Sequence, residues 1–176
     1  MDVLSRSIEV RLATDSDYES IWEIFSGIVS LGETYAFDPD TTKKQAYEIW
    51  MRGPAATFVA ERNGEILGTY YIKPNQPALG AHICNCGYMV SERARGQGVA
   101  TLMCEHSQKM ALELGFKAMQ FNLVVVTNDG AVRLWQRLGF DIVGTIPKAF
   151  DHRQLGYVDA YVMYKWLERQ GLRHRC

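Results

Sequence analysis

The stretch Val90-Ser91-Glu92-Arg93-Ala94-Arg95-Gly96-Gln97-Gly98-Val99-Ala100 joins the end of an expected strand to the start of a long amphipathic helix. Gly96 and Gly98 let backbone N–H groups approach a ligand closely, and the helix start adds the positive end of its dipole. Arg95 adds a fixed cation, so the stretch predicts a pyrophosphate site. It is neither a Rossmann loop, because position 101 is Thr, nor a Walker loop, because no Gly-Lys-Ser/Thr follows. An ordinary glycine-containing turn is the alternative interpretation.

A second segment, Asn128-Asp129-Gly130-Ala131-Val132-Arg133-Leu134-Trp135-Gln136-Arg137-Leu138-Gly139-Phe140, has the pattern of a short amphipathic helix. Asn128 or Asp129 can cap its first turn. Gly139 supplies the left-handed residue that ends the helix, and Phe140 enters the next strand. The residues of its apolar face are Ala131, Leu134, Trp135 and Leu138.

Both segments resemble motifs of the GNAT superfamily of N-acetyltransferases. Arg95-x-x-Gly98-x-Ala100 resembles the family's acetyl-coenzyme A loop, Gln/Arg-x-x-Gly-x-Gly/Ala, and residues 128–140 are similar to Asn-x-x-Ala-x-x-Leu-Tyr-x-x-Leu-Gly-Phe. The resemblance covers about residues 8–166 of a single expected domain, 1–176, with short tails at both ends. It implies acetyl-coenzyme A as co-substrate and no metal. The residues expected to bind the coenzyme are Met89, Val90, Arg95, Gly96, Gln97, Gly98, Val99, Ala100, Thr101, Asn128 and Trp135.

Hydrophobic patterning along the chain predicts an α/β domain. Strands are expected at 8–12, 57–62, 65–72, 81–90, 116–126, 140–146 and 157–166, and Asn63-Gly64 predicts a tight hairpin. Helices are expected at 14–29, 40–53, 99–114 and 129–138, with loops that include 31–40 and 147–156. The resemblance implies the GNAT arrangement, a mixed, mostly antiparallel central sheet of about seven strands with helices on both faces. Strands 81–90 and 117–126 would splay apart there and admit the acyl-coenzyme A.

The composition is that of a globular protein and argues against several classes of function. Of the 176 residues, 47% are hydrophobic, and the net charge of −1 argues against a nucleic-acid partner. No apolar run reaches the roughly 18 residues that a membrane span needs. Residues 1–7 lack the apolar segment of a signal peptide, so we expect a cytoplasmic protein. The basic segment 169–175 is interpreted as a solvated tail.

The cysteines do not follow a metal-binding or catalytic pattern. A Cys-x-Cys pair without a second pair or nearby histidines is a weak zinc signal, and no Cys/His/Asn pattern supports a nucleophile. We interpret them as reduced thiols that mostly fill the core. They are Cys84, Cys86, Cys104 and Cys176.

The resemblance implies direct transfer of the acetyl group to an amine. The thioester oxygen then needs a hydrogen-bond donor, which we expect to be the backbone N–H of Met89 or Val90. The family's usual Tyr is replaced by Trp135, whose indole N–H cannot serve as an acid. This departure is tolerable because a thiol has a pKa of about 8.5, so its thiolate can leave unprotonated. Trp135 either walls the thioester or fills the core.

The general base is ambiguous in the sequence. Glu33, in the loop after the first helix, and His82, on the strand that leads to the site, are both candidates. His106 is on the apolar face of its helix, where a packing role is expected. We place Asn122 with Glu33 and His82 in the candidate catalytic set.

Asparagines offer a separate indication of the acceptor. Asn85 and Asn122 are on the two splaying strands, where Asn is uncommon, and could hold the carboxylate and amine of a small substrate. With Asn128 they resemble a microbial GNAT branch that acetylates small amino and imino acids. Asn85, with Tyr35 or Phe37 as an apolar wall, forms the candidate substrate site. Hydrogen-bonded stitching of the strands is the alternative role of these amides.

The predicted function is therefore transfer of an acetyl group from acetyl-coenzyme A to a small-molecule amine, an amino or imino acid, in a ternary complex. One alternative is a protein N-terminal or lysine acetyltransferase. Another is a non-catalytic module that binds acyl-coenzyme A. The absence of the family's usual Tyr supports this alternative. The sequence leaves the acceptor and the oligomeric state open, a homodimer included.

Overall fold

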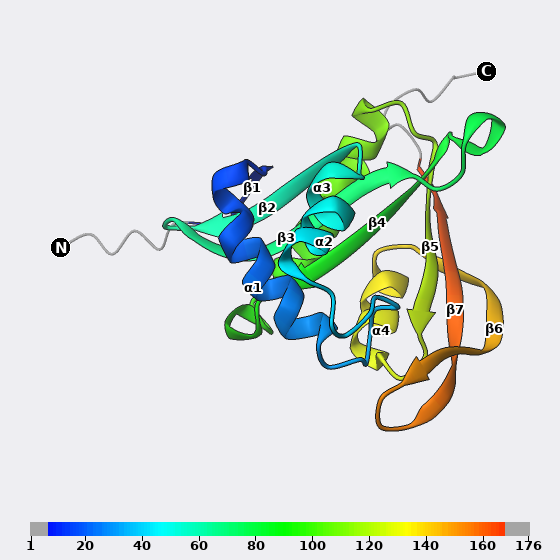
Figure 1. Ribbon diagram of the computed structural model, residues 1–176. Coiled ribbons are helices and arrows are strands. Elements are labelled where there is room, and N and C mark those ends of the chain that lie inside the picture. The colour runs from blue at the N-terminus through cyan, green and yellow to red at the C-terminus, as the bar shows by residue number, and fades with distance from the viewer. Residues whose placement is uncertain (1–6, 168–176) are drawn as a thin grey trace, which may run out of the picture.

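The computed structural model describes residues 7–167, which form a seven-stranded sheet flanked by helices (Figure 1). The strand order is β1-β2-β3-β4-β5-β7-β6, and each neighbouring pair is antiparallel except β4 and β5. The predicted fold is confirmed. Expectations for residues 1–6 and 168–176, including the basic tail and Cys176, lie outside the described residues. The strands are β1 (Glu9–Leu12), β2 (Ala56–Arg62), β3 (Glu65–Pro74), β4 (Ile83–Val90), β5 (Ala118–Val125), β6 (Asp141–His152) and β7 (Gly156–Trp166).

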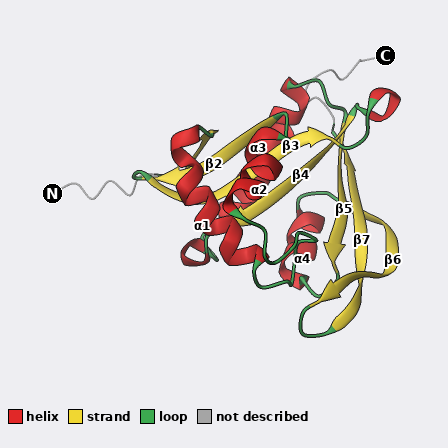
Figure 2. Cartoon of the chain, in the orientation of Figure 1, coloured by secondary structure: helices red, strands yellow, loops and turns green. Residues whose placement is uncertain are grey.

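Helices cover both faces of the sheet (Figure 2). Because successive strand residues point to opposite faces, the core is divided in two. Met89 of β4 packs beneath α1, whereas its neighbours Tyr88 and Val90 pack on the face of α3 and α4. The α-helices are α1 (Tyr18–Val29), α2 (Lys43–Tyr47), α3 (Val99–Glu113) and α4 (Asp129–Arg137). Shorter turns are the 3-10 helices η1 (Asp15–Asp17), η3 (Ala78–Gly80) and η4 (Glu92–Ala94) and the π-helical turn η2 (Glu48–Arg52).

The π-helical turn η2 carries Trp50 into the core beneath α1. Trp50 is fully buried, and its indole N–H donates to the Thr69 hydroxyl at 3.0 Å. Thr69 in turn donates to the Phe58 carbonyl at 2.9 Å, and the Thr57 hydroxyl donates to the Trp50 carbonyl at 2.6 Å. Every buried polar group in this set has a partner, so its burial carries little penalty. These bonds fix α2 and η2 against β2 and β3, and with them the end of the loop 30–42.

Strands β4 and β5 separate soon after they meet, which confirms the predicted splay. They pair only at Ile83 with Ala118 and at Cys84 with Met119. Beyond that point β5 diverges from β4 while it stays paired with β7, and the β5–β7 ladder is interrupted between Phe121 and Val124 (Figure 1). The result is an open sheet edge on each side of a wedge.

The expected loop at 147–156 is wrong, because β6 continues through it to His152. The strand keeps its pairing with β7 by two register shifts, between Ile142 and Gly144 and between Ile146 and Phe150. Such bulges absorb residues that break the alternating pattern, including Pro147, and they are tolerated because β6 is an edge strand. Only residues 153–155 connect β6 to β7.

Three cysteines, Cys84, Cys86 and Cys104, are buried free thiols. Within residues 7–167, no group of three or more His, Cys, Asp and Glu side chains is arranged to hold a metal ion. The same part of the chain has no helix that is long and apolar enough to cross a membrane.

Candidate active site

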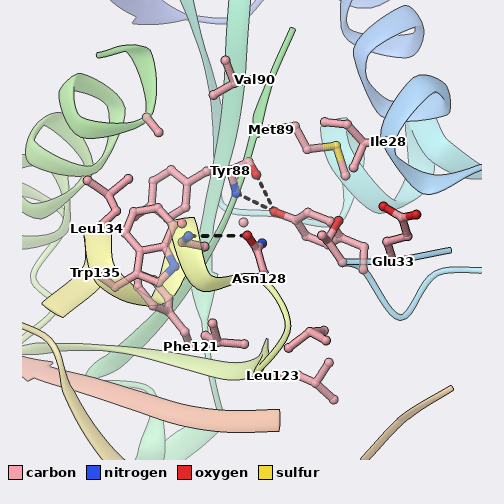
Figure 3. A pocket seen from close by; sticks show the side chains of 18 of the residues that line it. Ile28, Glu33, Tyr88, Met89, Val90, Phe121, Leu123, Asn128, Leu134 and Trp135 are labelled. Carbon is pink, nitrogen blue, oxygen red and sulfur yellow. Dashed lines mark hydrogen bonds between the residues drawn. The ribbon is translucent and has the colours of Figure 1, made fainter. Parts of the chain in front are cut away.

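The wedge between β4 and β5 opens into a cleft of about 1320 Å³. The loop 30–42, β3, β4, the segment before α3, β5, α4 and the β6–β7 turn all contribute to its wall. In Figure 3, Trp135 and Leu134 lie on one side of Tyr88, and Glu33 and Ile28 lie on the other. We call these two sides the α4 half and the α1 half.

The start of α3 presents unpaired backbone donors to the cleft. Gly96 and Gly98 have φ angles of 75° and 78°, in the left-handed region, and Gly98 is the N-cap of α3. The Leu102 N–H is the first to bond back, to the Gly98 carbonyl at 3.0 Å, which leaves the preceding helical N–H groups without an intrahelical partner. A Cβ atom added at Gly96 or Gly98 would meet nothing within 4 Å. Of the predicted loop residues, those that line the cleft are Arg95, Gly96, Gly98, Val99, Ala100 and Thr101.

Gln97, also predicted to bind the coenzyme, faces elsewhere. Its side-chain carbonyl accepts from the Arg62 guanidinium at 2.8 Å, and its amide donates to the Arg93 carbonyl at 3.0 Å. Gln97 therefore fastens the loop to β2 and is not part of the cleft wall. The sequence motif could not reveal this, because both partners depend on the folded loop.

The backbone of β4 alternates between β3 and the cleft. The Tyr35 hydroxyl accepts from the Tyr88 N–H at 2.9 Å and donates to the Tyr88 carbonyl at 2.6 Å, so Tyr88 directs its backbone into the cleft (Figure 3). Ser91 faces the other way, since its N–H donates to the Leu67 carbonyl of β3 at 2.8 Å. By the same alternation Met89 faces β3 and Val90 faces the cleft. Of the two predicted oxyanion donors, the geometry favours Val90.

Trp135 belongs to the core and to the wall of the cleft at once. It is 8% exposed, and its ring centroid lies 5.0 Å from that of Tyr88 and 5.2 Å from that of Phe121. Asn128 caps α4, because its side-chain oxygen accepts from the Ala131 N–H at 3.4 Å, and it also lines the cleft. The two roles expected for Trp135 are thus compatible.

Burial favours the neutral forms of two tyrosines and one thiol beside the cleft. Burial raises the pKa of Tyr88 and of Tyr35 far above the usual value of a phenol. Burial likewise raises the pKa of the Cys86 thiol, which lines the cleft. These groups are therefore poor acids, and Cys86 is a poor nucleophile.

The α1 half has an acidic group and an aromatic wall. Glu33 is half-buried, and its carboxylate makes no ion pair or hydrogen bond with the described residues. Tyr35 and Phe37 stack with ring centroids 5.6 Å apart, and Phe37 stacks on Phe25 of α1 at 5.6 Å. The structure thus brings together three of the predicted residues, Glu33, Tyr35 and Phe37.

Asn85 and Asn122 both line the cleft, and both are also hydrogen-bonded to protein. The buried Asn85 amide donates to the Gln120 carbonyl at 3.0 Å and accepts from the Tyr71 hydroxyl at 3.1 Å. The exposed Asn122 accepts from the Gln120 side chain at 3.0 Å and donates to Asn75 at 2.7 Å. The bond from Asn85 bridges β4 and β5 at the point where their ladder ends, so the stitching role is present.

The structure does not place His82 in the cleft. His82 precedes β4 at the closed end of the wedge, and its carbonyl accepts from the Lys117 N–H at 2.7 Å. His106 packs against β3, where its Nδ1 shares a 2.8 Å hydrogen bond with the Tyr70 hydroxyl and burial lowers its pKa. Both positions follow from the pairing of elements that the sequence alone does not reveal.

His152 is the cleft histidine that the sequence patterns missed. It is 7% exposed, and its Nδ1 faces the N–H groups of Gln154 and Leu155 at 3.2 and 3.3 Å. In the neutral ring the proton therefore sits on Nε2, which can donate but has no free lone pair. Residues 147–156 are expected to form a loop, because nothing in the local sequence marks His152 as the end of a strand. His152 is therefore not among the predicted cleft residues.

A splayed pair of parallel strands, a helix start with free backbone N–H groups and an apolar wall fit an acyltransferase that takes its acyl group from a coenzyme A thioester. The "Acetyltransferase (GNAT) family" matches residues 18–140. The chain belongs to this family and is an acetyl-coenzyme A-dependent N-acetyltransferase. The family resemblance expected from the loop at 90–100 and from the segment 128–140 is confirmed.

Individual relatives support the same assignment. The chain is 34% identical to N-acetyltransferase aca1 of Schizosaccharomyces pombe, over 76% of this chain and 72% of that protein. It is 27% identical to L-amino acid N-acetyltransferase AaaT of Escherichia coli, over 89% and 96% of the two chains. A solved GCN5-related N-acetyltransferase from Kribbella flavida is 46% identical and covers 91% of this chain and 98% of its own, with a TM-score of 0.87.

Solved structures with the same fold carry acetyl-coenzyme A. A GNAT superfamily phosphinothricin acetyltransferase from Sinorhizobium meliloti was solved in complex with acetyl-coenzyme A. It shares the fold at 18% identity and a TM-score of 0.81, over 96% of this chain and 97% of its own.

Proposed function

We propose that the protein transfers an acetyl group from acetyl-coenzyme A to the amine of a small molecule, an amino or imino acid, by direct attack in a ternary complex. The observation that carries the proposal is the closure of the α1 half. The Arg153 N–H donates to the Gly32 carbonyl at 3.1 Å, and its guanidinium donates to the Ser30 carbonyl at 2.9 Å. These bonds join the β6–β7 turn to the loop after α1, so the chain bounds a pocket where a peptide would need an open groove.

In this proposal the α4 half receives the coenzyme. The free N–H groups at the start of α3 and the Arg95 guanidinium bind its pyrophosphate, and Gly98 leaves room for that approach. The Val90 N–H donates to the thioester oxygen as it gains negative charge. Trp135 walls the thioester, and Asn128 holds the start of α4 beside the coenzyme channel.

The α1 half receives the acceptor, and Glu33 is the proposed general base. The acceptor's ammonium must lose a proton before it can attack, and the Glu33 carboxylate has free lone pairs inside the cleft. His82 does not line the cleft, and the Nδ1 of His152 is engaged by the turn, so neither competes for the role. Asn85 and Asn122 orient the acceptor through their remaining N–H groups.

Direct attack is supported by the environment of the other reactive groups. The raised pKa of Cys86 argues against an acetylated cysteine intermediate. Neither the buried tyrosines nor Trp135 offers a ready proton to the departing thiolate. The coenzyme thiolate can leave unprotonated at a cost of about 2 kcal/mol or less.

The names of two relatives fit a small acceptor, an L-amino acid for AaaT and phosphinothricin for the Sinorhizobium meliloti enzyme. The test is coenzyme A release from acetyl-coenzyme A against a panel of L-amino acids, imino acids, polyamines and peptides with a free N-terminus or lysine. We expect turnover with an amino or imino acid at the highest kcat/KM. A preference for peptides, or donor binding without turnover across the panel, would contradict the proposal.

A further inference from the structure

Near the closed end of the wedge, the α1 half contains a cation without an acidic partner. Lys73 of β3 lies beside Asn85 in the β3–β4 register and lines the cleft. Its ammonium sits 5.1 Å from the centroid of the Tyr71 ring, whose hydroxyl donates to Asn85. Within residues 7–167, Lys73 makes no salt bridge. The cation–π contact places the ammonium of this exposed residue beside the ring whose hydroxyl binds Asn85.

The neighbourhood of Lys73 is rich in donors. Asn85 donates one side-chain N–H to the Gln120 carbonyl, and Asn122 donates one to the Asn75 side chain. Each amide therefore has a second N–H that is free to donate. Burial raises the pKa of Tyr71 to about 12, which keeps this ring neutral beside the cation. No negative charge of the protein is therefore found next to Lys73 at this end of the described cleft.

Charged side chains of both signs line the cleft, and they come from different elements. Glu33 is the one carboxylate that lines it among the described residues, and it comes from the loop after α1. The Lys and Arg side chains in the lining are Lys73, Arg95 and Arg137, of which Arg95 belongs to the pyrophosphate loop and Arg137 to α4. Lys73 is thus the ammonium left for the acceptor's half of the cleft.

We infer that Lys73 binds the carboxylate of the acceptor, assisted by the spare N–H groups of Asn85 and Asn122. This inference rests on the proposed function and narrows it. The acceptor carries a free amine and a nearby carboxylate, with the amine toward Glu33 and the carboxylate toward Lys73. Amines without a carboxylate lose this anchor.

The experiment compares acids with their carboxamides. The acceptors are L-alanine, L-proline and L-methionine, each beside the amide that lacks the negative charge. The variants are Lys73→Gln and Lys73→Arg, and Lys109→Gln on the exposed surface of α3 is the matched control. We expect Lys73→Gln to lower kcat/KM for the acids by about 10-fold to 100-fold, the usual range for a lost charge-assisted hydrogen bond.

The same variant should leave kcat/KM for the amides and KM for acetyl-coenzyme A within about twofold of wild type, because only the contact to the acceptor's carboxylate is lost. Lys73→Arg should retain most of the preference for acids. Equal losses on acids and amides, or no loss on either, would overturn the role of Lys73 while leaving the enzyme an amino-acid acetyltransferase. A wild-type enzyme that prefers the amides, or uses neither, would overturn the proposed substrate class together with it.

Discussion

Glu33 is the residue on which the proposed proton transfer depends. Replacing it by the isosteric Glu33→Gln removes the base and keeps the size of the side chain. We expect kcat/KM for the amino-acid acceptor to fall by about 100-fold or more, the usual contribution of a general base. Steady-state kinetics with the acceptor varied measures the loss.

Glu23→Gln, on the exposed face of α1, is the matched control, and it should behave as wild type. Acetyl-coenzyme A affinity of Glu33→Gln should also stay near wild type, because the carboxylate lies in the α1 half. A Glu33→Gln enzyme with normal kcat/KM would show that another group, or water, accepts the proton.

Substitutions of Trp135 test whether protonation of the leaving thiolate limits the reaction. Trp135→Phe keeps an aromatic wall against Tyr88 and Phe121 and should retain most turnover. Trp135→Tyr restores the hydroxyl that the family motif carries, yet we expect less than about a tenfold gain in kcat at pH 7–8, equivalent to about 1.4 kcal/mol. Single-turnover rates of wild type, Trp135→Phe and Trp135→Tyr show whether protonation of the leaving thiolate limits the reaction. A large acceleration by Tyr would mean that an acid had been missing.

At the scale of elements, the loop before α3 should determine donor affinity. Arg95→Ala removes a cation from the loop, and Gly98→Asp places a carboxylate where the backbone must approach a phosphate. Both variants should bind acetyl-coenzyme A at least about tenfold more weakly by calorimetric titration, a loss of about 1.4 kcal/mol or more.

Gly64→Asp is the matched control for backbone strain. Gly64 has a φ of 82°, close to the 78° of Gly98, and a Cβ there also meets nothing within 4 Å, but it lies in the β2–β3 hairpin outside the cleft. Gly64→Asp should lose stability without losing affinity. A folded Gly98→Asp protein with wild-type affinity would refute the loop assignment.

Elements governed by local rules could be predicted from the sequence. The glycines of the loop at 96 and 98, the cap at Asn128 and the stop at Gly139 act within a few residues, and the structure has them at helix ends. Glu33 is a candidate base only as a carboxylate in the loop after the first helix, and that loop has no local signal that places it in the cleft.

Elements fixed by tertiary pairing could not be predicted. His152 enters the cleft because two bulges extend β6, and a bulge depends on the partner strand. The bonds of Asn85 to Gln120 and of Gln97 to Arg62 join segments 35 residues apart in each case. His82 lies outside the cleft for the same reason, since its strand position gives no information about which end of the wedge is closed.

For the whole molecule, one ion pair makes stability depend on pH. The Arg11 guanidinium, 2.8 and 2.9 Å from the Asp17 oxygens, lowers the pKa of this buried carboxyl to about 2. In the unfolded chain the value is about 3.9. A depressed pKa in the folded state stabilises the protein above pH 4, and this stabilisation is lost as the pH falls toward 2.

Asp17→Asn should therefore lower the free energy of unfolding at pH 7 by about 1 to 2 kcal/mol, after allowance for the partly exposed Arg11. Denaturant titrations should show this difference shrinking between pH 4 and pH 2. Asp40→Asn, on the exposed loop before α2, should have no such effect at any pH. A difference that stays constant with pH would show that Asp17 acts through packing and not through its charge.

The central claim is that one cleft holds donor and acceptor together and that the acetyl group passes directly between them. The most direct measurement is a matrix of initial rates with acetyl-coenzyme A and an amino acid both varied, with the N-acetyl product identified by mass spectrometry. We predict intersecting double-reciprocal lines and an N-acetylated amino acid. Parallel lines, together with enzyme that carries an acetyl group when the acceptor is omitted, would contradict the account.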